Sequence, residues 1–192
     1  MEMNSPSSRD FRYPVAVLFC LVFLLFSRFA ELAHKPYHHD ESLYATEAWR
    51  YATQGLYKFN PMMHGPFLFH AHAALFKIFP INDFTGRLPV ALAGTLLALF
   101  AFSFVQRAGW LSAVVWLSLV SFSPIFCYFS RFLGMALLMA FLAPGFFVFS
   151  LRSWEKRSAT SLYGAAAFFV FMVCTKLNWL FYFFSFGTFF LA

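Results

Sequence analysis

Long apolar runs alternate with short polar segments along most of the chain. A helix needs about 20 apolar residues to cross the roughly 30 Å hydrocarbon core of a bilayer. We predict transmembrane helices over about residues 14–33, 88–105, 110–128, 132–151, 160–175 and 178–192. The pattern therefore predicts an all-α fold, a polytopic transmembrane helical bundle that forms one membrane domain over residues 1–192.

Turn residues and isolated charges mark the breaks between these runs. Residues 106–109 form a predicted turn, and Ser123-Pro124 interrupts the end of the third span. Pro144 lies inside the fourth span, where it is expected to kink the helix. Lys176 is the only charged residue after residue 160, and it separates the last two spans.

The two ends of the chain carry further expectations. The run over residues 14–33 is longer than the apolar part of a signal peptide and lacks a small-residue cleavage site, so we expect a retained first helix. A helix from Trp179 to the last residue would have about 14 residues, which is short for a crossing. We therefore expect a truncated product or a fragment.

The composition agrees with a membrane protein and excludes other classes. The chain is 61% hydrophobic and 11% charged, whereas soluble domains are about 45–50% apolar and about 25% charged. Its net charge is +6, but single basic residues between apolar runs offer no continuous face for nucleic-acid phosphates. Three cysteines lie inside apolar runs and match no disulfide or metal spacing. Membrane lipid is the predicted partner, and nothing in the composition indicates an oligomeric state.

The distribution of basic residues predicts the orientation, because cytoplasmic loops are enriched in Lys and Arg. Placing the N-terminus in the cytoplasm puts the most basic segments inside: Arg9, Arg12, Arg107 and residues 152–157. The segment of residues 34–87, Arg131 and Lys176 then lie outside. We expect a multi-pass protein of the cell (inner) membrane with its first loop outside.

The outer loop of residues 34–87 contains two predicted juxtamembrane helices. Residues 40–54 form an amphipathic helix for which Asp40 is the expected N-cap and Gly55 the end. Such a helix lies on the membrane surface. Within residues 64–79, Pro66 is placed where a first helical turn tolerates it, and the remainder forms a second, apolar helix that is too short to span comfortably.

Candidate chemistry is concentrated at the start of this loop. Asp40 and Glu41 follow His38 and His39 directly after the first span. A carboxylate held at the membrane–water boundary can act as a general base toward a hydroxyl group or can bind a cation. For Asp40 the alternative is a helix cap on a solvated face.

The histidines offer a weaker pattern. His70 and His72 are two residues apart, so they project from different faces of a helix and do not converge. We predict no transition-metal site. A divalent cation remains an optional cofactor, because Asp40 and Glu41 supply hard oxygen ligands.

Several short motifs occur in a fixed order. They are His39-Asp40-Glu41 with Tyr44 and Ala45, Gly55-Leu56-Tyr57, His64-Gly65-Pro66, an apolar helix ending near Asp83, and Arg87 at the opening of the second span. Over about residues 10–180 this order resembles the GT-C membrane glycosyltransferases of the protein-mannosyltransferase and aminoarabinose-transferase-like superfamily. Within it, the chain most resembles the flippase-activity-associated branch of the archaeal N-glycosylation type. We expect it to be a truncated member of that branch.

The resemblance implies a donor and a set of site residues. It implies a polyprenyl-phosphate-linked sugar donor and a catalytic carboxylate at Asp40, with Glu41 beside it. Ser130-Arg131-Phe132 resembles the family's Ser-Arg-Phe motif, and Thr175-Lys176 resembles a family Thr-Lys segment. The substrate-binding residues that follow are His39, Tyr44, His64, Arg87, Arg131 and Lys176.

The implied reaction transfers a sugar on the non-cytoplasmic face of the membrane. Asp40 deprotonates or orients the acceptor hydroxyl, and direct displacement inverts the anomeric carbon. Arg131 and Lys176 supply positive charge for the departing lipid phosphate, for which Arg offers a bidentate contact. Arg87 is expected to position the second span or to pair with acids of the loop. The chain departs from many relatives in having no acid among residues 133–136.

Two other functions are compatible with the sequence. One is a non-enzymatic membrane component that binds polyprenyl-linked sugars or assists their flipping. The other is a fragment of a transporter, which should carry charged or broken helices near the middle of the membrane. Most ionisable residues here lie at the ends of the predicted spans, which favours a site at the outer face.

Overall fold

The computed structural model describes residues 12–58, 60 and 63–191. Within these residues the chain forms nine helices and no strand, which confirms the all-α prediction. The helices are α1 (Arg12–Phe29), α2 (His39–Gln54), α3 (Phe67–Ile78), α4 (Asp83–Leu99), α5 (Ala101–Phe122), α6 (Pro124–Phe129), α7 (Met135–Lys156), α8 (Ala159–Thr175) and α9 (Trp179–Leu191).

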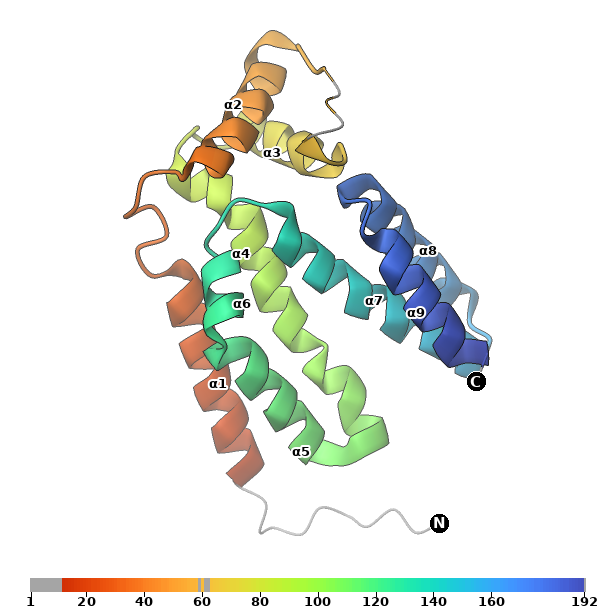
Figure 1. Ribbon diagram of the computed structural model, residues 1–192. Coiled ribbons are helices and arrows are strands. Elements are labelled where there is room, and N and C mark those ends of the chain that lie inside the picture. The colour runs from red at the N-terminus through yellow and green to blue at the C-terminus, as the bar shows by residue number, and fades with distance from the viewer. Residues whose placement is uncertain (1–11, 59, 61–62, 192) are drawn as a thin grey trace, which may run out of the picture.

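The long helices form a bundle whose two ends are distinct (Figure 1). Helix α1 packs on α5, and α4 packs on both α5 and α7. Helix α7 makes its most extensive contact with α8, and α9 contacts both of them. The α2–α3 pair covers one end of the bundle, whereas α1 begins at the other end (Figure 1).

Three helical segments are long and apolar enough to cross a membrane: Arg12–Phe29, Asp83–Val105 and Met135–Lys156. Large apolar side chains on α1 face outward, with Leu18, Phe19 and Phe26 at least 63% exposed. Exposed Phe and Leu along a long helix are explained by contact with acyl chains, because water would penalise them. The chain is therefore a membrane protein.

The remaining predicted spans correspond to shorter apolar helices. These are Arg107–Phe122, Ala159–Thr175 and Trp179–Phe189. The expected break after the third span is present, because α5 ends at Phe122 and Pro124 begins α6. Near the predicted turn of residues 106–109, Gly109 interrupts α5 with a φ of 76°.

Helix α2 begins one residue earlier than expected, and its cap is different. The N-cap is His38, so the prediction that Asp40 caps this helix is wrong. The His38 ring accepts from the backbone N–H of Asp40, and the Glu41 carboxylate accepts from the N–H of His38. This reciprocal arrangement is a capping box, which satisfies the free N–H groups at the helix start. Gly55 ends the helix in the left-handed conformation, as expected.

Close contacts fix the outer loop on the bundle. A side chain at Gly86 would clash with the Tyr37 hydroxyl, and one at Gly94 would clash with the Ser130 hydroxyl. His72 also links α3 to α4, because its ring nitrogens lie 2.8 and 2.7 Å from the carbonyl oxygens of Leu68 and Gly86. The segment that contains Tyr37 and helix α3 are therefore both held against the start of α4.

Candidate functional site

The centre of the site is a buried ion pair between α2 and α4. Glu41 and Arg87 have side chains that are only 3% and 5% exposed. Arg87 donates from Nε to Glu41 Oε1 at 2.9 Å and from Nη2 to Oε2 at 2.8 Å. This is the bidentate geometry in which guanidinium and carboxylate bind most strongly. The sequence predicted that Arg87 positions the second span or pairs with acids of the loop, and the structure shows the pair with Glu41.

Backbone carbonyl oxygens accept further hydrogen bonds from Arg87. Arg87 also donates to the carbonyl oxygens of Leu32, Lys35 and Pro36, at 3.0, 2.7 and 3.2 Å. The Tyr37 ring lies 5.0 Å from the guanidinium carbon of Arg87. One arginine therefore ties the segment that follows α1 to the first turns of α4.

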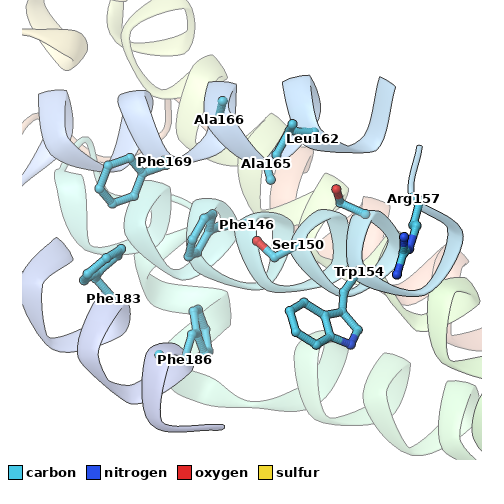
Figure 2. A pocket seen from close by; sticks show the side chains of 12 residues that line it. Phe146, Ser150, Trp154, Arg157, Leu162, Ala165, Ala166, Phe169, Phe183 and Phe186 are labelled. Carbon is cyan, nitrogen blue, oxygen red and sulfur yellow. The ribbon is translucent and has the colours of Figure 1, made fainter. Parts of the chain in front are cut away.

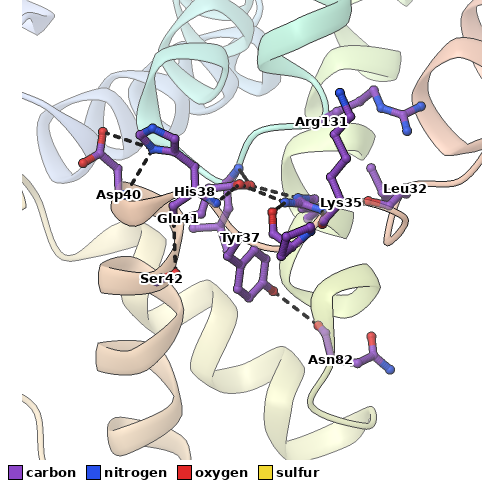
Figure 3. A network of polar contacts seen from close by, with 12 residues as sticks. Leu32, Lys35, Tyr37, His38, Asp40, Glu41, Ser42, Asn82 and Arg131 are labelled. Atoms are coloured by element: carbon purple, nitrogen blue, oxygen red, sulfur yellow. Dashed lines mark hydrogen bonds and ion pairs between the residues drawn. The ribbon is translucent and has the colours of Figure 1, made fainter.

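Glu41 uses both carboxylate oxygens in this network (Figure 3). Besides Arg87, it accepts from the backbone N–H of Leu133 at 2.8 Å and of His38 at 2.9 Å. Burial by itself raises the pKa of Glu41, but donation from Arg87 and from these two N–H groups outweighs it, so its pKa lies below the ordinary glutamate value. Four N–H donors occupy the lone pairs of Glu41, which leaves none for a further hydrogen-bond donor.

Asp40 has the opposite environment. Its side chain is 59% exposed, and its carboxylate lies 3.9 Å from Nδ1 of His38 (Figure 3). Tyr44 lies one helical turn further along α2, half-buried, and its pKa is raised by burial and then by the charge of Asp40. Asp40 is therefore a solvated acid that a substrate can reach. His39, at the first position of α2, is also exposed.

A cavity of about 640 Å³ lies beside the ion pair. It is bounded by the segment after α1, the start of α2 and the segment that joins α6 to α7. One wall is aromatic, because Phe132 stacks on Tyr128 at 5.6 Å and lies 5.8 Å from the His38 ring. The charged residues of the lining are Glu31, Lys35, Glu41, Arg87 and Arg131.

The cavity has a net positive lining. Glu41 and Arg87 neutralise each other, which leaves Lys35 and Arg131 against a single further acid, Glu31. Arg131 donates to the carbonyl oxygens of Ser27, Ala30 and Glu31 at 3.0, 2.7 and 2.9 Å. These bonds cap the end of α1 but do not cancel the charge of Arg131. The cavity is therefore suited to an anion.

His64 and Lys176 form a separate group that does not line this cavity. The backbone N–H of Gly65 donates to the carbonyl oxygen of Thr175 at 3.0 Å, which docks the loop before α3 on the end of α8. Burial and then the charge of Lys176 lower the pKa of His64. The structure thus divides the predicted phosphate ligands, with Arg131 at the cavity and Lys176 beside the α3 loop.

The sequence analysis did not select several cavity residues. Lys35 and Tyr128 line the cavity but belong to no recognised motif, and His38 was named only as a neighbour of the acidic pair. The position of Lys35 between the first span and the acidic pair was the only available signal. Among the described residues, no group of three or more His, Cys, Asp or Glu side chains is placed to hold a metal ion.

No protein-family model, curated protein or solved structure matches this chain significantly. The function is therefore argued from the site itself.

Proposed function

We propose that the chain is a membrane glycosyltransferase that moves a sugar from a polyprenyl-phosphate-linked donor to an acceptor hydroxyl on the non-cytoplasmic face. One observation carries the proposal: the exposed acid Asp40 lies beside a positively charged cavity at one end of an apolar helical bundle. A lipid-linked sugar phosphate has the matching parts, namely an apolar chain, an anionic phosphate and a sugar.

The charges of the cavity support binding of the donor phosphate. Lys35 and Arg131 face the cavity without a carboxylate partner of their own among the described residues. Two cations near the membrane surface stabilise the negative charge that develops on a departing phosphate. The stacked rings of Tyr128 and Phe132 offer an apolar wall for the sugar.

The reaction assigns Asp40 the role of general base. The acceptor oxygen forms a bond to the anomeric carbon while the bond from that carbon to the phosphate oxygen breaks. The acceptor proton passes to the Asp40 carboxylate, and the bonding electrons leave with the lipid phosphate. Attack opposite the leaving group inverts the anomeric carbon. Glu41 and Arg87 hold the start of α2, and therefore Asp40, against the cavity.

A second candidate is a protein that binds polyprenyl-linked sugars without transferring them. It is favoured by the fact that Glu41, one of the two acids that line the cavity, is fully engaged, whereas Asp40 lies outside the lining. In that case the basic cavity would still bind lipid phosphate, but no base would act.

Replacement of Asp40 by Asn separates the two candidates. General-base catalysis contributes about 10²–10⁴-fold to a rate, so Asp40→Asn should lower sugar transfer from a polyprenyl-phosphate donor by about that factor. Donor binding should be retained, because Lys35 and Arg131 are intact. The measurement is transfer of radiolabelled sugar in reconstituted vesicles, together with donor binding.

The matched control is Glu47→Gln. Glu47 is also an acid of α2, but it pairs with Arg50 at 2.8 Å and does not line the cavity. This variant should transfer sugar at the parent rate. Equal rates for Asp40→Asn and the parent chain would remove Asp40 from catalysis, and donor binding without any transfer by the parent chain would favour the second candidate.

A further inference from the structure

A second large cavity lies at the opposite end of the bundle from the candidate site. It is a groove of about 800 Å³ between α7, α8 and α9 (Figure 2). Phe146, Phe169 and Phe183 form much of its wall. Phe146 also packs against buried Met139 and Met172, which anchors that wall in the bundle.

The groove is open along α9. A side chain built at Gly187, which lines it, would meet nothing within 4 Å. Helix α7 is one of the three segments able to cross a membrane, so the groove beside it faces the acyl chains of a bilayer. An apolar channel in this position is suited to a hydrocarbon chain.

One end of the groove is polar. Ser150 and Ser153 line it on α7, and Arg157 lies at the turn into α8 (Figure 2). Trp154 lines the same end and is 73% exposed, which is typical of an indole at a membrane–water interface. An apolar channel that ends in hydroxyl groups and a guanidinium has the chemistry of a phospholipid site.

Two neighbouring arginines at this end are already engaged, but Arg157 is not. Arg107 forms an ion pair with Glu155, and Arg152 donates to the Ser103 hydroxyl at 3.2 Å. Among the described residues, no acid lies within ion-pair distance of Arg157. Its charge is therefore available for an anion, and basic pockets between transmembrane helices bind anionic head groups.

We propose that this groove is a binding site for one anionic membrane phospholipid, with an acyl chain against Phe146 and Phe169 and the phosphate at Arg157. The proposed ligand is a structural lipid, and this proposal does not depend on the glycosyltransferase proposal. The groove reaches the end of α7, whereas Asp40 lies on α2, which covers the opposite end of the bundle (Figure 1).

The test is native mass spectrometry of the protein released from bilayers of equimolar phosphatidylglycerol and phosphatidylcholine. The parent chain should retain one phosphatidylglycerol per protein, in preference to phosphatidylcholine. Arg157→Gln should reduce this preference about fivefold, because one basic residue contributes about that much at an anionic lipid surface. Lys156→Gln removes the same charge one residue away, outside the groove lining, and should leave the preference unchanged.

Two variants test the apolar part. Ala166→Phe fills the groove from α8, and Gly187→Leu fills it from α9, where space is open. Both should abolish retention of the lipid. Ala167→Phe places the same ring on the next residue of α8, which does not line this groove, and should retain it.

Three outcomes would overturn the proposal. They are equal retention of the two lipids by the parent chain, unchanged retention in both filled variants, and a parent dimer that becomes a lipid-free monomer on Ala166→Phe. The last result would assign the groove to a second copy of the chain. If Ala166→Phe fails to fold, Gly187→Leu and Arg157→Gln still decide between a lipid site and none.

Discussion

Asp40 and Glu41 are neighbours on α2, yet their side chains have opposite environments. Successive residues of a helix are about 100° apart, so one carboxylate reaches the buried Arg87 while the other projects into solvent. The buried acid has four donors and a fixed position. The exposed acid has the freedom that proton transfer requires. The geometry of one helical turn therefore gives two neighbouring acids one buried and one solvated environment.

Removing one partner of the buried pair should be strongly destabilising. Glu41→Gln leaves the Arg87 guanidinium buried without its carboxylate, and such a change typically costs about 3–5 kcal/mol. We expect a loss of about this size in the free energy of unfolding, measured by denaturant titration in detergent micelles.

An exposed ion pair provides the comparison. Glu47→Gln breaks the pair with Arg50, whose side chain is 52% exposed, so the cost should be below about 1 kcal/mol. Similar costs for Glu41→Gln and Glu47→Gln would show that the Glu41–Arg87 pair does not hold the outer loop.

The same pair should make stability depend on pH. The pKa of Glu41 is lower in the folded chain than in the unfolded chain, so the unfolded chain binds its proton first as the pH falls. The contribution of Glu41 to the free energy of unfolding is fully present above the ordinary glutamate pKa of about 4.3. It declines below that value and is lost once the pH passes the folded pKa.

Unfolding measured between about pH 3 and pH 7, bracketing the ordinary glutamate pKa, would show this dependence. In the parent chain the free energy of unfolding should fall below about pH 4.3. In the Glu41→Gln variant most of this fall should be absent. An equal decline in both chains would mean that other carboxylates govern acid unfolding.

At the scale of elements, a glycine contact fixes the α2–α3 pair over the bundle. The N–H of Gly65 donates to Thr175, and a side chain at Gly65 would lie 2.0 Å from the carbonyl oxygen of Cys174. Because this oxygen belongs to the backbone, a side chain at Gly65 could be accommodated only if the loop or the end of α8 moved. The loop before α3 therefore depends on this glycine to reach the end of α8.

Gly65→Ala should separate these two elements. Overpacking of this kind typically costs about 1–3 kcal/mol, and hydrogen exchange at residues 63–65 should increase. Gly187→Ala is the control, because a Cβ there meets nothing within 4 Å, and alanine in a helix is favourable by up to about 1 kcal/mol. An unchanged stability for Gly65→Ala would show that the loop does not require the close contact.

The hydrophobic pattern predicted the helices well, because apolar runs and their turn residues are local features. The two helices of the outer loop and the break at Pro124 were correct for this reason. The cap of α2 was wrong, since His38 and Asp40 can both cap a helix and only the pairing of Glu41 with Arg87 decides between them. The separation of Lys176 from Arg131 also depends on tertiary packing, which residue spacing does not encode.

At the scale of the whole molecule, the structure separates two kinds of basic surface. Lys35 and Arg131 line the cavity beside the start of α2, and Lys176 lies near His64 in the loop before α3. Arg107 pairs with Glu155 near the end of α7, and Arg157 follows α7. Helices α2 and α3 cover one end of the bundle, and α7 ends away from them (Figure 1). Between them lie apolar helices able to cross a membrane. The two proposed sites therefore lie toward opposite ends of these helices.

The positive-inside rule predicts that the end with Arg107 and residues 152–157 faces the cytoplasm. Cysteine labelling tests this orientation. Glu47→Cys introduces a thiol on α2, and Lys156→Cys introduces one at the α7–α8 turn. With a membrane-impermeant maleimide, Glu47→Cys should be labelled in intact cells and Lys156→Cys only after permeabilisation, with the parent chain giving the background. The reverse pattern would place Asp40 in the cytosol and refute transfer on the outer face. It would leave the groove at Arg157 a lipid site of the outer leaflet, so the two proposals can fail separately.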